Sequence, residues 1–390
     1  MTDQPAYKDP AAVPHGLATT QVDGHDITLL RDGETVFPAM LADIAQAKRE
    51  VSLEMYWTGN DAVGRVFRGA LTAAARRGCL VRVVCDAFGS LELPAGFWDE
   101  LLAAGGQVSP FHSSAEPAGA PLWRSLVSRD HRKVLCVDRR IVYVGGLNLA
   151  APWLPHSQGG AAWRDTALRL YGSEAAAAAA GLFDQTWKYL RELPAIHGAR
   201  PIATVGPRLV LLANHPQHRS GRVIRRMYLW AIRRAQHSID ITAAYFAPRL
   251  LFVQALLRAH RSGVRVRILL PLHSDVFLAN VVAAPAIRYL LKHGISVYAY
   301  QNGFLHAKTA VVDSRWVTVG SHNLDALSWA FNLECNVAID DRKLGQAMDR
   351  SFEEDLAASV QLSSAPKPAG LVDRAREIGG KLLLAGYRWL

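Results

Sequence analysis

One segment of the chain recurs 175 positions further along, and this repeat limits the possible folds more than any other feature. The first copy reads HRKVLCVDRRIVYVGGLNL from His131, and the second reads HAKTAVVDSRWVTVGSHNL from His306. Each copy begins with the pattern His-x-Lys-x4-Asp and predicts a strand, a two-residue turn and a second strand. A glycine-rich turn follows and ends at Asn148 or Asn323. Because the copies lie too far apart to form one local unit, they predict two similar halves.

The sequence before each copy also repeats. Residues 37–86 and residues 224–271 each read as an amphipathic helix, a short strand, a second helix, a glycine turn and another strand. Gly78 and Gly263 stand where a glycine would end the second helix of each unit. Alternating helices and strands predict an α/β fold with a layered sheet in each half. A stretch containing proline and glycine, at 191–205, predicts the boundary between the halves.

Four parts are expected along the chain: a flexible N-terminus (1–20), a first lobe (21–195), a second lobe (205–362) and an amphipathic tail (363–390). The tail has apolar side chains at helical spacing between Leu371 and Trp389, with cationic flanks. This pattern indicates either an interfacial helix or a helix packed on the body. No stretch approaches the roughly 18 apolar residues that a spanning helix needs, and the N-terminus lacks the apolar core of a secretory signal.

The motif places two basic side chains on one face of a strand. Residues two apart on a strand point to the same side, so His131 lies beside Lys133 and His306 beside Lys308. Such neighbours repel one another unless an anion lies between them, and a phosphate group suits that position. Imidazole can attack phosphorus or carry a proton near neutral pH. No His-x3-His or His-Glu-x-x-His pattern accompanies the motifs, and lysine repels cations, so we expect no metal and no cofactor.

The carboxylates near the motifs have different expected roles. Asp138 and Asp313 lie five positions beyond the lysines, on the opposite side of a straight strand, and are interpreted as structural anchors. A catalytic histidine needs a carboxylate to fix its tautomer, and Asp165 and Glu334 are the candidates. The alternative for Asp165 is an ion pair with the adjacent Arg164.

The two glycine-rich turns differ at two positions. Ser321 and His322 stand where the first copy has Gly146 and Leu147. We expect Ser321 to add a hydrogen-bond donor for phosphate. We expect His322 to cap the turn or to face solvent.

The duplicated motif, followed by Gly-Gly-x-Asn in one copy and Gly-Ser-x-Asn in the other, resembles the phospholipase D superfamily. The resemblance extends from about Leu29 to about Leu362. Shorter matches, among them DAFGS at 86–90, WRDT at 163–166 and YFAP at 245–248, make the chain most similar to the bacterial cardiolipin synthases. The resemblance implies a monomer of two phospholipase D-like lobes, each a mixed β-sheet flanked by helices. A pseudo-twofold axis relates these lobes, and one active site lies between them.

The resemblance also implies a two-step reaction. One histidine attacks the phosphodiester and forms a phospho-histidine, while the other protonates the leaving alkoxide and then activates an incoming alcohol or water. By this similarity His131 is the nucleophile and His306 the general acid and base. The expected catalytic residues are His131, Lys133, Asp138, His306, Lys308 and Asp313. The expected phosphate-binding or supporting residues are Asn148, Asn323, Ser321, Asp165 and Glu334.

The charge of the chain suits an anionic partner. Lysine and arginine total 44 against 34 acidic residues, which gives a net charge of +10. The resemblance implies transfer of a phosphatidyl group between two phosphatidylglycerol molecules to make cardiolipin, in peripheral contact with an anionic membrane. Phospholipid hydrolysis is the alternative, and a metal-independent nuclease or a non-catalytic binder also stays open. We expect no nucleic acid, because the basic helix around 222–234 is interpreted as a surface element.

Two further observations bear on location and substrate. The four cysteines lie in or beside apolar runs and predict buried free thiols, which fits a reducing compartment and the cytoplasmic face of the bacterial inner membrane. The apolar stretches 120–127 and 275–291 could admit acyl chains near the site. The second stretch could equally be a core helix interrupted at Pro285.

Overall fold

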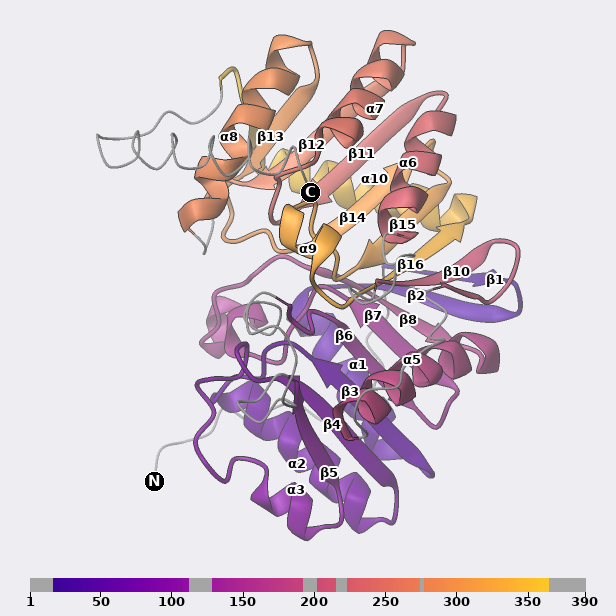
Figure 1. Cartoon of the computed structure of the whole chain (residues 1–390), viewed down its shortest axis with the longest axis vertical. Coiled ribbons are helices and arrows are strands. Elements are labelled where there is room, and N and C mark those ends of the chain that lie inside the picture. The colour runs from indigo at the N-terminus through magenta and orange to yellow at the C-terminus, as the bar shows by residue number, and fades with distance from the viewer. Residues whose placement is uncertain (1–16, 112–127, 192–201, 215–222, 274–276, 365–390) are drawn as a thin grey trace.

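The computed structural model of the protein describes residues 17–111, 128–191, 202–214, 223–273 and 277–364. These residues form two lobes that lie one above the other in Figure 1, the N-terminal lobe mainly in indigo and magenta and the C-terminal lobe mainly in orange and yellow. Each lobe is built on one large mixed sheet. This architecture confirms the predicted α/β fold of two similar lobes.

The two sheets have the same strand order. In the described part of the chain, the first sheet has the order β1-β2-β8-β7-β6-β3-β4-β5. Its strands are β1 (Ala18–Val22), β2 (His25–Arg31), β3 (Glu50–Met55), β4 (Leu80–Asp86), β5 (Gln107–Phe111), β6 (Lys133–Val137), β7 (Ile141–Gly145) and β8 (Thr166–Tyr171). The first strand begins inside the 1–20 stretch that the sequence predicts to be flexible.

The second sheet has the order β9-β10-β16-β15-β14-β11-β12-β13-β17, which repeats the first order strand by strand and adds β17 at its edge. Its strands are β9 (Ile202–Thr204), β10 (Leu209–Asn214), β11 (Ser238–Ala243), β12 (Arg265–Pro271), β13 (Ser296–Tyr300), β14 (Lys308–Val312), β15 (Trp316–Gly320), β16 (Glu334–Asp340) and β17 (Ser359–Gln361). The sequence repeat is therefore a repeat of topology as well.

In each sheet, strand direction places the start of the motif strand at the end where the parallel strands finish. Strands β3, β4 and β5 run parallel, as do β11, β12 and β13, and helices connect them. The motif strands β6 and β14 lie antiparallel to β3 and β11, with Lys133 opposite Met55 and Lys308 opposite Ala243. The start of each motif strand thus meets the carboxyl ends of the parallel strands, the usual place for a site in such sheets.

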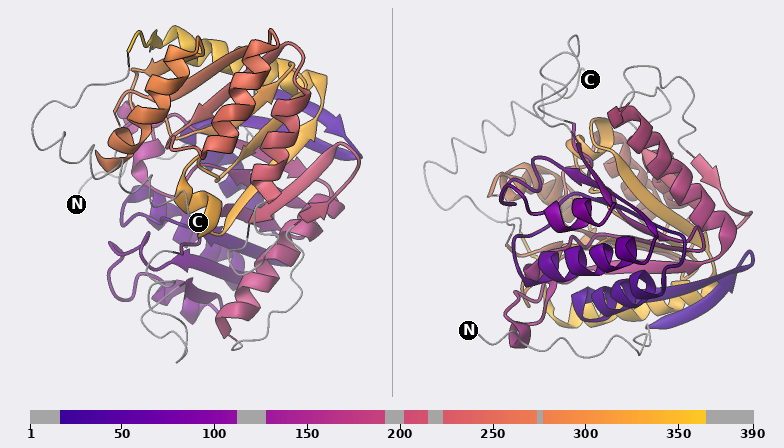
Figure 2. Two further views of the ribbon diagram at one scale, coloured as in Figure 1. Left: turned by 45° about the horizontal axis from the view of Figure 1, so that its top comes forward. Right: turned by 90° about the horizontal axis from the view of Figure 1, so that it is seen from below.

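The helices form an outer layer on each lobe and an inner layer between the lobes. They are α1 (Asp32–Gln46), α2 (Ala62–Arg76), α3 (Asp99–Ala103), α5 (Ser173–Arg191), α6 (Val223–Arg234), α7 (Leu250–Arg261), α8 (Phe277–Lys292), α9 (Ala326–Ala330) and α10 (Arg342–Ala357), with short 3-10 helices η1 (Ala151–Trp153) and η2 (His156–Gln158). Helices α1 to α3 pack on the first sheet, and α6 to α8 cover the outer face of the second (Figure 2).

The two lobes share one apolar core. Side chains from β7 and β8 of the first sheet pack with side chains from β10, β15 and β16 of the second, and α5 and α10 contribute to the same cluster. Val144, Val319 and Val337 are among its fully buried members. A core that belongs to both sheets holds the lobes in one arrangement, so groups from different lobes can meet with fixed geometry.

The predicted glycine turns are confirmed. Gly78 follows α2 with φ +91°, and Gly263 follows α7 with φ +90°. Both values lie in the left-handed region, where glycine has no steric penalty. A side chain at either position would meet no neighbouring atom, so the backbone angle alone accounts for the glycine.

Other expectations for the apolar segments have mixed outcomes. Helix α8 runs through Pro285 without a break, and Ala284 and Leu290 on it are buried. The helix expected in the stretch 275–291 is present from residue 277, whereas the predicted interruption at Pro285 is wrong. The stretch 120–127 and the tail from 365 onward lie outside the described residues. In the described part of the chain, no helix combines the length and apolarity needed to cross a bilayer. All four cysteines are buried free thiols, as predicted.

Candidate active site

The segment before each motif strand pairs with the other lobe. The His131 amide donates to the Leu333 carbonyl at 3.0 Å, and the Leu333 amide donates to the Arg129 carbonyl at 2.8 Å. In the second lobe, the His306 amide donates to the Arg164 carbonyl at 2.8 Å. Residue 333 directly precedes Glu334, and residue 164 directly precedes Asp165. The backbone pairing therefore carries each histidine to a carboxylate of the opposite lobe.

The two histidine–carboxylate pairs are crossed between the lobes. His131 Nδ1 lies 3.1 and 3.2 Å from the two carboxylate oxygens of Glu334. His306 Nδ1 lies 2.7 Å from Asp165 Oδ2. A proton shared at Nδ1 leaves Nε2 of each ring available for chemistry. This reciprocal arrangement is what an approximate two-fold relation between the lobes produces.

Aromatic rings hold the imidazoles in place. The Tyr56 ring meets His131 edge to face, with 5.0 Å between ring centroids. The Trp153 ring meets His306 in the same way at 5.2 Å, and its Nε1 donates to Asp165 Oδ2 at 3.0 Å. Each histidine is thus fixed by a carboxylate at one side and a ring at another, so its orientation does not depend on substrate.

Both motif lysines are buried beside the histidines. Lys133 Nζ donates to the His131 carbonyl at 2.8 Å, and Lys308 Nζ donates to the His306 carbonyl. Burial lowers the pKa of Lys133 to about 7. The charge of Lys308 contributes to lowering the pKa of His131, and the charge of Lys133 contributes to lowering the pKa of His306. The four basic groups therefore act on one another as a single cluster assembled from both lobes.

Burial sets the protonation states of the cluster. It is the main cause that lowers the pKa of His131 well below its usual range and the pKa of His306 to about 4. Burial also raises the pKa of Glu334. Asp165 behaves differently, because burial, which would raise its pKa, is outweighed by the hydrogen bond from His306, the charge of Lys308 and the Thr166 amide, so its pKa is lowered. Both imidazoles are consequently neutral at pH 7 in the absence of a bound anion.

The motif aspartates contact backbone rather than the histidines. The Asp138 carboxylate accepts from the amides of residues 48, 49 and 50 at 2.7–3.0 Å. The Asp313 carboxylate accepts from the amides of residues 236, 237 and 238 at 2.7–2.9 Å. Both aspartates have positive φ, 52° and 54°, which aspartate tolerates better than most residues. These contacts tie the end of the motif strand to the start of its neighbour, the geometry of an anchor.

The supporting residues fall into two kinds. Asn148 Oδ1 accepts from the Trp57 amide at 3.2 Å, while Asn323 Oδ1 is buried without a hydrogen-bond partner among the described residues. Ser321 Oγ donates to Glu334 and accepts from the Cys335 amide at 3.0 Å. The Ser321 proton is thus directed at the carboxylate, not toward the space where a phosphate would lie.

One expectation from the sequence is wrong, and one alternative interpretation is not found. His322 neither caps the turn nor faces solvent, because its side chain is fully buried and packs against the Trp329 ring at 5.6 Å between centroids. The alternative ion pair of Asp165 with Arg164 is absent. The Arg164 guanidinium instead donates through Nε to Asp355 at 2.8 Å and through Nη2 to Ser351 at 2.9 Å.

Two buried arginines, Arg132 and Arg164, are not among the site residues that the sequence predicts. Arg132 lies between the motif histidine and lysine and donates to Glu54 Oε1 at 3.1 Å and to the Asn214 carbonyl at 3.2 Å. It therefore joins the first motif strand to the second lobe, just as Arg164 joins the first lobe to α10. The alternation of strand side chains could have shown that Arg132 faces away from the histidine, but not which partners it meets.

Comparison with known proteins decides the family. A family model described as "Cardiolipin synthase, PLD-like domain" matches residues 40–187 and 228–356, which include both motifs. The chain belongs to the cardiolipin synthase family. Cardiolipin synthase B of Escherichia coli K12 is 34% identical over 352 residues, covering 87% of this chain and 82% of that relative. The major cardiolipin synthase ClsA of Bacillus subtilis 168 is 33% identical over 346 residues, covering 86% of this chain and 70% of the relative.

Solved structures share the fold of this family member. The phosphatidylserine synthase of Haemophilus influenzae Rd KW20 superposes with a TM-score of 0.69 over 93% of both chains. At 13% identity this likeness concerns the fold alone. It agrees with the arrangement of two lobes around a shared core.

Proposed function

We propose that this member of the cardiolipin synthase family is a phosphatidyltransferase that makes cardiolipin from two molecules of phosphatidylglycerol. The observation that carries the proposal is the crossed site, in which two histidine–carboxylate pairs and two buried lysines meet in one cluster. Such a cluster brings two lysine side chains and two imidazoles from different lobes together. A phosphodiester anion suits this arrangement, because the lysines can contact its oxygens while a neutral imidazole attacks its phosphorus.

In the first step, His131 is the nucleophile. Its Nε2 forms a bond to phosphorus while the bond from phosphorus to the glycerol headgroup oxygen breaks. The His306 Nε2 gives its proton to that oxygen, so glycerol leaves as a neutral alcohol and the phosphatidyl group stays on His131. Glu334 holds the Nδ1 proton of His131 and stabilises the positive charge of the phosphorylated ring.

In the second step, His306 acts as a base. It takes the proton from a headgroup hydroxyl of a second phosphatidylglycerol, and the resulting oxygen nucleophile attacks phosphorus. The bond between phosphorus and His131 breaks, cardiolipin is released, and both histidines return to their starting states. The two steps use the same acid–base residue in opposite directions, as microscopic reversibility requires.

Asp165 and Glu334 differ in pKa and in distance to their histidines, and these differences support the assignment of roles. The acid of the first step must carry protons on both ring nitrogens, and an ionised carboxylate at Nδ1 stabilises that imidazolium. Asp165, whose pKa is lowered, lies 2.7 Å from His306. Glu334, whose pKa is raised by burial, lies further from His131, at 3.1 Å. A bound phosphate anion raises the pKa of both histidines, and the Asp165 pair favours His306 as the one that is protonated.

The lysines and asparagines complete the phosphate site. Lys133 and Lys308 supply charge to the phosphoryl oxygens, and the amide groups of Asn148 and Asn323 supply hydrogen bonds. Ser321 supports the site through Glu334, to which its hydroxyl donates. In this proposal Asp138 and Asp313 act by holding the motif strands in register.

The proposal includes peripheral contact with an anionic membrane, at the cytoplasmic face of the bacterial inner membrane. Leu250 and Leu251, at the start of α7, are 59% and 60% exposed, and Leu327 on α9 is 46% exposed. The two helices lie together, with Phe252 and Trp329 rings 5.5 Å apart. Exposed leucines beside the site and a net charge of +10 suit an anionic lipid surface. In sedimentation with phosphatidylglycerol vesicles we expect the protein in the pellet, and protein left in the supernatant would contradict this contact.

Product analysis tests the function directly. Purified protein is incubated with phosphatidylglycerol liposomes and EDTA, and the products are identified by mass spectrometry. We expect cardiolipin and an equal amount of glycerol, because no step uses a metal ion. Phosphatidic acid without cardiolipin would show that water is the acceptor and would overturn the transferase proposal. Fragments released from DNA, with no lipid product, would instead indicate a nuclease.

A further inference from the structure

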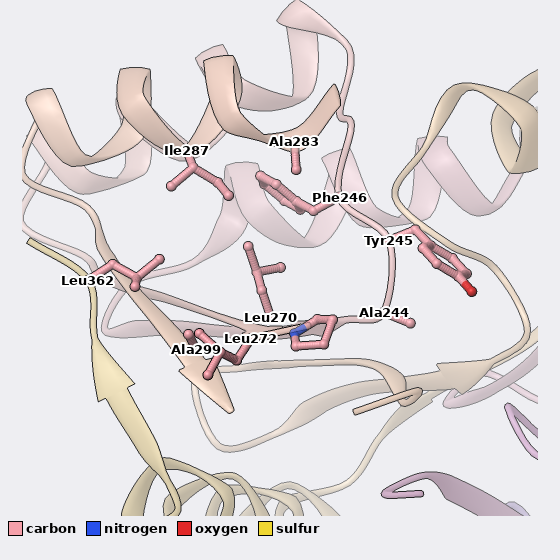
Figure 3. Close-up of a pocket in the computed structure, with 10 residues that line it drawn as sticks. Ala244, Tyr245, Phe246, Leu270, Leu272, Ala283, Ile287, Ala299 and Leu362 are labelled. Atoms are coloured by element: carbon pink, nitrogen blue, oxygen red, sulfur yellow. The ribbon is translucent and has the colours of Figure 1, made fainter. Parts of the chain in front are cut away.

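An apolar hollow lies next to the site in the second lobe, beneath α8 and at the carboxyl ends of β11, β12 and β13 (Figure 3). The hollow is open to solvent on one side, and its cavity volume is about 30 Å³. The lining residues are Ala244, Tyr245, Phe246, Leu270, Pro271, Leu272, Ala283, Ile287, Ala299 and Leu362. The hollow therefore lies between the roof formed by α8 and the floor formed by the sheet.

The lining of the hollow is apolar and favours a hydrocarbon group over a polar one. No charged side chain contributes to it, and the Tyr245 hydroxyl, the one polar side-chain group in the lining, points away from the hollow in Figure 3. Burying a charged or hydroxylated headgroup there would leave its polar atoms without partners. An aliphatic chain would instead bury apolar surface at about 25 cal/mol per Å². The lining therefore disfavours a headgroup and favours the end of a slender apolar chain.

The hollow shares a wall with the catalytic cluster. Tyr245 lines it, and the same ring lies edge to face with His306 at 6.4 Å between centroids. Phe246, the next lining residue, forms a backbone bridge with Leu324, the neighbour of Asn323. Tyr245 thus contacts both the hollow and His306, so the hollow adjoins the place where a phosphate would lie.

The two lobes differ at the position of this hollow. Sheet order makes α8 the counterpart of α3, since each connects the second and third parallel strands of its lobe. Helix α3 has 5 residues, and α8 has 16. In the first lobe, Phe97 and Leu101 are buried at the short helix α3. The longer helix α8 contributes Ala283 and Ile287 to the lining, so the roof of the hollow depends on a feature that α3 lacks.

We infer that this hollow binds part of one acyl chain of the phospholipid held at the site. The inference rests on the proposed function, because it assigns a place to the apolar part of that substrate. Binding energy from the chain positions a phosphate that the reacting groups alone would hold loosely. The hollow therefore makes the enzyme sensitive to acyl-chain length.

Filling the hollow tests the inference. Ala283→Leu and Ile287→Trp each add side-chain volume from α8, and kcat/KM is measured with dioleoyl and dihexanoyl phosphatidylglycerol in the same mixed micelles. We expect the ratio of long-chain to short-chain kcat/KM to fall about tenfold or more, as for one or two methylenes excluded from a pocket. Ala259→Leu is the matched control, since Ala259 packs against the same core from α7 without lining the hollow. A ratio equal to that of the control in both variants would overturn the inference.

A second measurement does not depend on variant folding. Wild-type protein is photolysed with phosphatidylglycerol that carries a diazirine at the end of one acyl chain, and the labelled peptides are identified by mass spectrometry. Labels within 244–246 or 283–287 would support the inference, and labels confined to other segments would contradict it. Failure of the proposed function is distinguishable, because it would appear as absence of cardiolipin from wild-type protein with either chain length.

Discussion

Replacing His131 with alanine should abolish cardiolipin formation, with kcat lowered by about 10⁴-fold or more. The substitution removes the only atom that accepts the phosphatidyl group in the proposed mechanism, so no other residue of the cluster can compensate. His306 could still activate water as a base, but without His131 no phosphorylated enzyme would form for that water to hydrolyse. Turnover is measured as cardiolipin formed from phosphatidylglycerol liposomes.

Chemical trapping separates this loss from a folding defect. Wild-type protein quenched during turnover with ³²P-labelled phosphatidylglycerol should carry label that is stable to alkali and released by acid, as a phosphorus–nitrogen bond requires. The His131→Ala protein should carry none. His237→Ala is the matched control, because His237 is exposed at the opposite end of the sheet from the site. Equal labelling of His131→Ala and wild type would reject His131 as the nucleophile.

The topology was largely readable from the repeat. Periodicity and glycine turns located α1, β3, α2 and β4 and their counterparts in the second half, because each such unit is determined by contacts close in sequence. The length of α8 and the hollow beneath it were not predictable. Pro285 suggested a break, but the flanking residues pack well enough for the helix to continue through it. Tertiary packing outweighed a local preference at that point.

The residues of the site were predictable from the sequence, but the pairing between them was not. The motif spacing identified the histidines and lysines, and the need for tautomer control identified Asp165 and Glu334. The crossed pairing joins residues 203 and 141 positions apart, and it follows from the packing of two sheets rather than from any local pattern. His322 is a second example of a residue whose surroundings the local sequence does not predict. A polar residue in a glycine-rich turn suggests exposure, yet His322 is buried against Trp329 in the second lobe.

Replacing His306 with alanine should have an effect that depends on the leaving group. With phosphatidylglycerol, glycerol leaves as a strong base, so loss of the general acid should slow transfer by roughly 10² to 10⁴-fold. With a p-nitrophenyl phosphatidyl ester, nitrophenolate leaves without a proton. The first step should then lose less than about tenfold, and it is measured as a burst of nitrophenol equal to the enzyme present.

The burst should be followed by almost no further release, because the second step still needs a base to activate the acceptor alcohol. His131→Ala should show no burst with the same ester. This contrast assigns the two roles independently of total activity, since both variants are nearly inactive on phosphatidylglycerol. If His131→Ala gave the burst and His306→Ala did not, the roles would be exchanged. His306 would then be the nucleophile, with Asp165 stabilising its phosphorylated ring, and His131 would be the general acid and base.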